Sequence, residues 1–312
     1  MNSRYPGAAI TGWGIALPDK IVTNADFAAR LDTSHEWIVE RTGIHERRHG
    51  GSTGSLAVEA GEVALAKAGV AASGIDLLIL STTTPDQAVP ASSSAVNAQL
   101  GCAGAAFDLN AACAGFVYSI VTAVAMLGTG YERALVIGAD TLSRITDQED
   151  RTTAVLFADG AGAVVIEARD DRQLLLSHDL GVDGTLTSIL YADHGGYIAM
   201  EGREVFRRAV RASVDSAVKV LEAAGVTADD IALFVPHQAN QRIIDAAVQR
   251  LGLSPEKSAI VLDRTGNTSS GSMGIALAEA ADEGRLHDGD LVLLSGFGAG
   301  MTWASAVLRW GS

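Results

Sequence analysis

The chain has 312 residues, of which 48% are hydrophobic and 19% are charged. This length exceeds one ordinary hydrophobic core and predicts either two fused halves or one large α/β unit. A formal net charge of −14 argues against nucleic acid and membranes as partners, because their phosphates repel an acidic surface. Residues 1–7 contain no basic segment followed by an apolar run, so no secretory signal is expected.

The cysteines and the most apolar segment both favour a cytoplasmic location. The chain has two cysteines, Cys102 and Cys113, which are too few for a disulfide framework and fit an intracellular location. Residues 109–131 carry no formal charge, but their apolar part spans only about residues 113–127. A bilayer requires roughly 20 apolar residues. This segment therefore predicts a buried core helix.

Along the chain, the same series of elements is predicted twice. A helix ending at Gly69 leads to a strand at 75–80, then to a strand at 134–138 and a glycine-rich turn at 159–162. In the second half, a helix ending at Gly225 leads to strands at 231–235 and 291–296 and to a glycine-rich turn at 298–300. Gly69 and Gly225 are 156 residues apart, as are Ile75 and Ile231, which indicates an internal duplication.

The duplication predicts two fused α/β halves, residues 1–170 and 171–312. The predicted strands are continuous apolar runs, as expected for sheets that are covered on both faces. Helices alternating with strands predict βαβ units and largely parallel pairing. The first half has an extra segment near residues 141–153. A repetitive Ala/Gly/Val composition that imitates a repeat is the alternative interpretation.

Cys113 is the candidate nucleophile. It stands at the predicted start of the uncharged helix, among small residues that leave room for a ligand. Helix N-termini present unpaired N–H groups and a partial positive charge, so we expect the thiol pKa to fall below its usual value of about 8.5. Taken alone, Cys113 fits a structural cysteine packed as a small hydrophobe better than a nucleophile.

Three further segments carry candidate catalytic groups. His237 follows an apolar strand and precedes a helix expected near Gln241, and α/β proteins bind ligands at the carboxyl ends of parallel strands. Asn267 lies in a loop that leads into a helix predicted at 273–281, and Gly298 lies in a glycine-rich turn that offers a backbone oxyanion donor. Each segment also fits an ordinary helix terminus or turn.

Two other patterns are excluded as sites. His45 and His49 match H-E-x-x-H, but nearby glycines oppose the helix that this zinc motif needs, and two arginines would adjoin the metal. The pattern beginning at Gly12 lacks the third glycine of a dinucleotide fingerprint, because Leu17 takes its place. Neither zinc nor a dinucleotide is expected.

Arginines gather on one predicted helix. Arg203, Arg207 and Arg211 are spaced by four residues and therefore share a helix face. In such an acidic chain this face could attract an anionic partner, although a merely solvated face is the alternative.

Together these motifs resemble the β-ketoacyl-acyl carrier protein synthase III family of the thiolase superfamily. The resemblance extends from about residue 8 to residue 309, and the matching segments occur in family order. These segments are residues 33–44, 112–116, 157–162, 236–240, 266–269 and 298–303. The resemblance implies an α/β, thiolase-like, five-layered αβαβα fold of two pseudo-repeat halves, and a homodimer.

The resemblance also implies a mechanism. Cys113 takes the acyl group of an acyl-CoA primer, and its own N–H and that of Gly298 hold the thioester oxyanion. His237 and Asn267 donate to the thioester oxygen of malonyl-acyl carrier protein and stabilise the enolate that forms as CO2 leaves. Acyl-CoA is a substrate here, so neither a cofactor nor a metal is implied.

Coenzyme A contacts are implied for five residues. Trp37 and Arg151 correspond to the adenine site, Arg41 to a phosphate contact, and Phe206 and Asn240 to the wall of the pantetheine tunnel.

Further residues are implied at the acyl pocket and at the carrier-protein surface. Val89 stands where some relatives have a larger aromatic that reaches into the acyl pocket of the partner subunit. It would shape that pocket together with Leu142, Phe157 and the 185–200 loop. The carrier protein would meet the positive charges of three arginines, namely Arg207, Arg242 and Arg250.

The third active-site residue separates related activities. Thiolases have a Cys-His-Cys active site, but no cysteine follows Cys113 in this chain. Elongating synthases have a second histidine at the position of Asn267. The prediction is therefore an acyltransferase that initiates fatty acid or related polyketide synthesis. An acyltransferase of a specialised pathway that works without decarboxylation, and a non-catalytic partner subunit, are the alternatives. Primer identity stays open.

Overall fold

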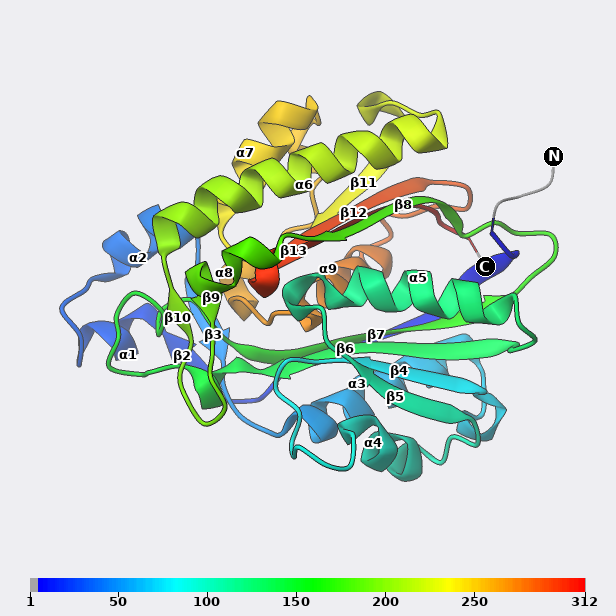
Figure 1. Cartoon of the computed structure of the whole chain (residues 1–312), viewed down its shortest axis with the longest axis horizontal. Helices are drawn as coiled ribbons and strands as arrows, with labels where there is room; N and C mark the ends of the chain where they lie inside the picture. Colours follow the sequence, from blue (N-terminus) through cyan, green and yellow to red (C-terminus); the bar gives the residue numbers. More distant parts are fainter. Residues whose placement is uncertain (1–4, 312) are drawn as a thin grey trace.

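Two large mixed β-sheets and three layers of helices form the body of the described part of the chain (Figure 1). The structure is a computed structural model that describes residues 5–311. Residues 1–4, most of the stretch assessed above for a secretory signal, lie outside this range, as does residue 312. Within the described range, no helix has the length and apolarity needed to cross a bilayer.

The first sheet has the order β1-β7-β6-β4-β5, and the second has the order β11-β12-β13-β8. The strands of the first sheet are β1 (Ala8–Ala16), β4 (Leu77–Ser81), β5 (Ala105–Leu109), β6 (Arg133–Thr141) and β7 (Asp159–Ala168). Those of the second are β8 (Leu175–Val182), β11 (Ile231–Pro236), β12 (Leu291–Gly298) and β13 (Thr302–Arg309).

The main helices form three layers around the sheets. Figure 1 shows α3 (Thr53–Ala68) and α4 (Ser92–Leu100) outside the first sheet, and α6 (Gly202–Ala224) and α7 (Gln241–Leu251) outside the second. Between the sheets lie α5 (Gly115–Leu127) and α9 (Gly271–Asp282). The predicted five layers, helix–sheet–helix–sheet–helix, are confirmed.

The uncharged segment forms α5, a buried core helix of 13 residues, as predicted. Phe116 and Ile120 of this helix pack in a single hydrophobic cluster with Ile79 of the first sheet and Leu294 of the second. The sequence of α5 carries no charge because both of its long sides face a sheet.

Largely parallel pairing was a wrong prediction. In the two large sheets, β4 runs parallel to β5 and β6, and β11 to β12, whereas the other four pairings are antiparallel. The strands β6 and β7, like β12 and β13, are joined without an intervening α-helix. Such connections return the chain directly alongside itself and so produce antiparallel neighbours.

The internal duplication is visible in matching local geometry. Gly69 and Gly225 end α3 and α6 in the left-handed conformation, at φ +68° and +70°. Short 3-10 turns follow at η1 (Ala72–Gly74) and η5 (Ala228–Asp230). The order β1-β7-β6-β4 repeats as β8-β13-β12-β11. We propose that the halves meet at residues 170 and 171, in the turn between β7 and β8.

Smaller elements cluster around the ends of the strands. They are α1 (Asn24–Ala28), α2 (His35–Thr42), α8 (Leu262–Thr265), β2 (Ile21–Thr23), β3 (Glu46–Arg48), β9 (Leu190–Tyr191) and β10 (Ala199–Met200), with the 3-10 segments η2 (Ala112–Ala114), η3 (Leu142–Ile145), η4 (Gly184–Ile189), η6 (Pro255–Lys257) and η7 (Ala299–Met301). His45 and His49 flank strand β3, so the helical spacing of a zinc motif is not realised.

Candidate active site

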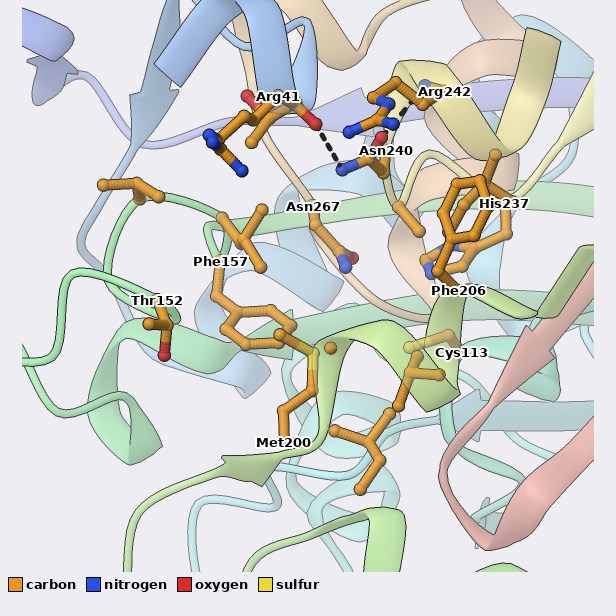
Figure 2. A pocket seen from close by; sticks show the side chains of 18 of the residues that line it. Arg41, Cys113, Thr152, Phe157, Met200, Phe206, His237, Asn240, Arg242 and Asn267 are labelled. Carbon is orange, nitrogen blue, oxygen red and sulfur yellow. Dashed lines mark hydrogen bonds between the residues drawn. The ribbon is translucent and has the colours of Figure 1, made fainter. Parts of the chain in front are cut away.

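One cavity brings together the four predicted catalytic residues. Its volume is about 640 Å³, and Gly298 lines it together with Cys113, His237 and Asn267 (Figure 2). Cys113 comes from the first half of the chain and the other three from the second. Their assembly therefore requires the two halves to pack against each other.

Cys113 sits in η2, immediately before α5, on a strained backbone. Ala112 has φ +49°, and the one other non-glycine residue with positive φ among residues 5–311 is Ser269, at +51°. Side chains disfavour this conformation, and such strain clusters at functional sites. Both outliers adjoin the thiol: Ala112 precedes Cys113 in the chain, and Ser269 Oγ accepts a hydrogen bond from Cys113 Sγ at 3.4 Å.

Gly298 brings its backbone against the nucleophile. A Cβ atom at this position would lie 2.6 Å from the Cys113 backbone nitrogen, a distance that no real side chain tolerates. Glycine is thus required for the close approach of the two backbones. The arrangement supports the predicted oxyanion site, in which two N–H groups face the same oxygen.

The expected lowering of the thiol pKa is wrong for this structure. Burial raises the pKa of Cys113 to about 12, the Ser269 hydrogen bond acts in the lowering direction, and the Asp140 carboxylate adds to the rise. Cys113 is only partly exposed and lines two cavities, and the protein around the sulfur displaces water that would hydrate a thiolate. That loss of hydration exceeds the effect of the helix N-terminus, and Cys113 is a neutral thiol near pH 7.

Asp140 is a site residue that the sequence reasoning missed. It is the second-last residue of β6 and is fully buried. Its Oδ1 accepts hydrogen bonds from Thr82, Thr83 and Thr84, and its Oδ2 accepts from the N–H and hydroxyl of Ser270. A charged residue inside an apolar strand is the sequence feature that could have indicated Asp140. Through Ser270, this carboxylate holds the start of α9 against the first half of the chain.

His237 is a neutral hydrogen-bonding group. It follows β11, and its backbone N–H donates to the Ser295 carbonyl at 2.9 Å, which extends the pairing of β11 with β12. The residue is 2% exposed, and its ring packs edge-on against Phe297, with 5.4 Å between ring centroids. Burial lowers the pKa of His237 to about 3. The imidazole is therefore uncharged and poorly suited to act as a base at neutral pH.

Asn267 is oriented by its backbone neighbours. Its N–H donates to Leu156 O at 3.0 Å, and its carbonyl accepts from Ala158 N–H at 2.9 Å. Its side-chain Oδ1 accepts from Ser269 N–H at 2.9 Å, which assigns the oxygen because an N–H can only donate. The Nδ2 donor is left to serve the cavity, as an enolate site requires.

The same cavity contains four of the five residues expected to bind coenzyme A. Trp37, Arg41, Phe206 and Asn240 line it, and Asn240 Nδ2 donates to the Arg41 carbonyl at 3.0 Å (Figure 2). Arg151 does not line it but lies over the Trp37 ring, 5.2 Å from the ring centroid.

A second cavity, of about 400 Å³, opens on the other side of the nucleophile. It is lined by Cys113, Leu142, Phe157 and parts of the 185–200 loop, so two of the three predicted acyl-pocket residues meet there. Val89 lines neither cavity of its own chain and is 84% exposed. Its predicted reach into a partner subunit stays a prediction.

The arginines expected to meet a carrier protein differ in their surroundings. Arg207 donates to both carboxylate oxygens of Glu204 at 2.7 Å, so a negative charge already lies beside it. Arg242 lines the large cavity beside Phe206, and Arg250 lies exposed in the last turn of α7. Arg203 also lines the cavity.

Comparison with known proteins identifies the family. Residues 107–184 match the family described as 3-oxoacyl-[acyl-carrier-protein] synthase III, and residues 221–310 match its C-terminal part. A β-ketoacyl-[acyl-carrier-protein] synthase III of Bradyrhizobium diazoefficiens is 50% identical, over 97% of this chain and 98% of that protein.

Solved structures agree. The crystal structure of 3-oxoacyl-[acyl-carrier-protein] synthase III from Aquifex aeolicus superimposes with a TM-score of 0.96 at 42% identity, covering 97% of this chain and 100% of that one. The priming β-ketosynthase of the R1128 polyketide biosynthetic pathway gives 0.94 at 35% identity, covering 100% and 98%. The chain therefore belongs to the β-ketoacyl-[acyl-carrier-protein] synthase III family and is a thiolase-fold condensing acyltransferase.

Proposed function

We propose that this enzyme joins an acyl-CoA primer to malonyl-acyl carrier protein by decarboxylative Claisen condensation, initiating fatty acid or related polyketide synthesis. One observation carries the assignment of roles. A thiol beside the Gly298 backbone shares its cavity with two neutral side chains, His237 and Asn267.

Acylation comes first. The Cys113 sulfur attacks the thioester carbonyl of the primer, and the N–H groups of Cys113 and Gly298 hold the oxyanion that forms. The carbon–sulfur bond to coenzyme A then breaks, and the departing sulfur takes up a proton to leave as the free thiol. Because burial raises the pKa of Cys113 to about 12, Cys113 reacts from its neutral thiol. The proton that it loses as the new carbon–sulfur bond forms ends on the departing coenzyme A sulfur.

Condensation follows at the same sulfur. The bond between the malonyl methylene carbon and its carboxylate breaks, CO2 leaves, and the electron pair forms an enolate. His237 Nε2–H and Asn267 Nδ2–H donate to the enolate oxygen, and neutral donors suit this task because they are not consumed by proton transfer. The methylene carbon attacks the acyl group, and the Cys113 thiolate is released and reprotonated.

The large cavity accounts for how both substrates reach the sulfur. An apolar wall containing Phe206 and a mouth bearing Trp37, Arg41 and Arg242 suit a pantetheine arm that ends in anionic phosphate. The acyl chain of the primer would occupy the smaller cavity beside Leu142 and Phe157.

A homodimer is part of this proposal. Strand β5 is an edge strand, and none of its residues is fully buried in the single chain. Its unpaired backbone groups can extend the sheet by pairing with a second copy. Val89, the most exposed large hydrophobic side chain in the described region, is available for such a contact.

Two half-reactions test the proposal. Intact-mass measurement after exposure to acetyl-CoA should show acylation that Cys113→Ala abolishes. Labelled malonyl-acyl carrier protein should then release CO2 and yield a β-ketoacyl product. Acylation with transfer but without CO2 release would favour the non-decarboxylating acyltransferase, and absence of acylation would favour a non-catalytic subunit.

A further inference from the structure

Ser272 contacts the hidden side of the catalytic imidazole. It lies in the first turn of α9, is fully buried, and its Oγ is 2.7 Å from His237 Nδ1. The same Oγ accepts a hydrogen bond from Gln238 N–H at 3.3 Å. His237 Nε2 has no hydrogen-bond partner among residues 5–311, so it is the nitrogen left for substrate.

These two contacts determine where the protons lie. A serine hydroxyl carries one hydrogen, and a neutral imidazole has one N–H and one bare nitrogen. Gln238 N–H can only donate, so it does not take the Ser272 proton. His237 Nδ1 is then the acceptor available to that proton. An Nδ1 that accepts is unprotonated, and the hydrogen of the neutral ring must be on Nε2.

The usual competing acceptor for a helical serine is a backbone carbonyl one turn earlier. Thr42, Thr122 and Thr265 each donate to such a carbonyl, at 2.7, 2.8 and 2.9 Å. Ser272 makes no bond of this kind within the described residues. Its hydroxyl is therefore committed to the imidazole.

We propose that Ser272 is a positioning residue that holds neutral His237 in the tautomer bearing its proton on Nε2. This inference rests on the proposed function, because that proton is what stabilises the malonyl enolate. Phe297, edge-on to the ring, restrains its tilt. The other tautomer would present a bare nitrogen to the enolate oxygen and repel it.

The tautomer can be measured without turnover. The chain has seven histidines, and ¹⁵N-labelled histidine gives separate signals for protonated and bare ring nitrogens. His237 is assigned by its disappearance in His237→Gln. The native enzyme should show a bare Nδ1 and a protonated Nε2. A protonated Nδ1 in the native enzyme would overturn the proposal.

Ser272→Ala then tests the consequence. The His237 signals should shift to a mixture of tautomers, and CO2 release should fall about 3- to 30-fold, the effect of one lost hydrogen bond. Acylation of Cys113 by acetyl-CoA should be unchanged, because that step does not use the His237 proton. The drop should appear in kcat more than in KM.

Ser177→Ala is the matched control. Ser177 is also a buried serine with one side-chain hydrogen bond, to Val220 O at 2.6 Å, and it lies in β8 away from the cavity. It should leave both half-reactions unchanged. If Ser272→Ala slows acylation and CO2 release equally, Ser272 is merely structural and the inference fails. If the native enzyme releases no CO2, the proposed function fails, whereas the native tautomer is still read.

Discussion

The thiol of Cys113 donates a hydrogen bond to the hydroxyl of Ser269, and these two residues are 156 positions apart. Each stands two residues before a central helix, α5 at Gly115 or α9 at Gly271. They are thus equivalent positions of the duplicated unit. The duplication brings the segments before these two helices into contact at the proposed nucleophile.

Ser269 should set how readily Cys113 reacts. The Ser269 hydroxyl accepts from the neutral thiol, but it can rotate and donate to the thiolate. That second hydrogen bond opposes the rise in the thiol pKa that burial causes, so Ser269→Ala should raise that pKa further. We expect alkylation by iodoacetamide at pH 8 to slow by roughly 3- to 10-fold, the effect of about one hydrogen bond. In the native enzyme the rate should keep rising through pH 10, because the pKa is about 12.

Ser269→Gly separates the hydroxyl from the strained backbone. It removes the same hydrogen bond but relieves the positive φ of +51°. Its alkylation should be as slow as that of Ser269→Ala, whereas its free energy of unfolding should be higher than that of Ser269→Ala by about 1 kcal/mol. Equal alkylation rates in the native enzyme and both variants would refute the role of the hydroxyl.

Gly298→Ala should block acylation. Its Cβ would lie 2.6 Å from the Cys113 nitrogen and displace one of the two oxyanion donors. We expect the acylation rate, followed by intact mass with acetyl-CoA, to fall by about 10²- to 10³-fold. Gly184→Ala is the control, since a Cβ there meets nothing within 4 Å. Normal acylation by Gly298→Ala would exclude the oxyanion role.

His237 should make the fold sensitive to acid. Its pKa is about 3 in the folded chain, against 6.5 for an unperturbed histidine. Below pH 6.5, therefore, His237 binds a proton in the unfolded chain but not in the folded chain. Stability is therefore full above pH 6.5 and is lost as the pH falls toward 3. Between pH 7 and pH 5 this amounts to about 2 kcal/mol.

Urea unfolding at pH 7 and pH 5 measures this loss. The native enzyme should lose about 2 kcal/mol more than His237→Gln over that interval. Burial also lowers the pKa of His49, so both proteins should share an additional loss from that residue. An identical pH dependence for the two proteins would contradict a buried neutral imidazole.

The carrier-protein arginines should contribute unequally. Arg250 has no ion pair within residues 5–311, whereas Glu204 already binds Arg207. We therefore expect Arg250→Ala to raise the KM for malonyl-acyl carrier protein by roughly 3- to 10-fold, and Arg207→Ala to raise it less. Neither residue lines the large cavity, so the KM for acetyl-CoA should stay constant. A larger effect from Arg207→Ala would argue against this surface.

Much of the architecture was predictable because it depends on local patterns of apolar, charged and glycine residues. The 156-residue offset between Gly69 and Gly225, and the continuous apolar strands, predicted two packed α/β halves. The uncharged run predicted α5. Motif order predicted that Cys113, His237 and Asn267 share a site, and one cavity contains them.

The tertiary structure alone decided strand direction, the thiol pKa and the supporting contacts of the site. Antiparallel pairing of β6 with β7 depends on the path of a connection, which residue periodicity does not report. The pKa of Cys113 reflects solvent excluded by both halves together, and that desolvation outweighs the local helix terminus. Ser272 and Asp140 act through partners 35 and 130 residues away. Local sequence determines which elements form, whereas burial and long-range contacts determine what their side chains can do.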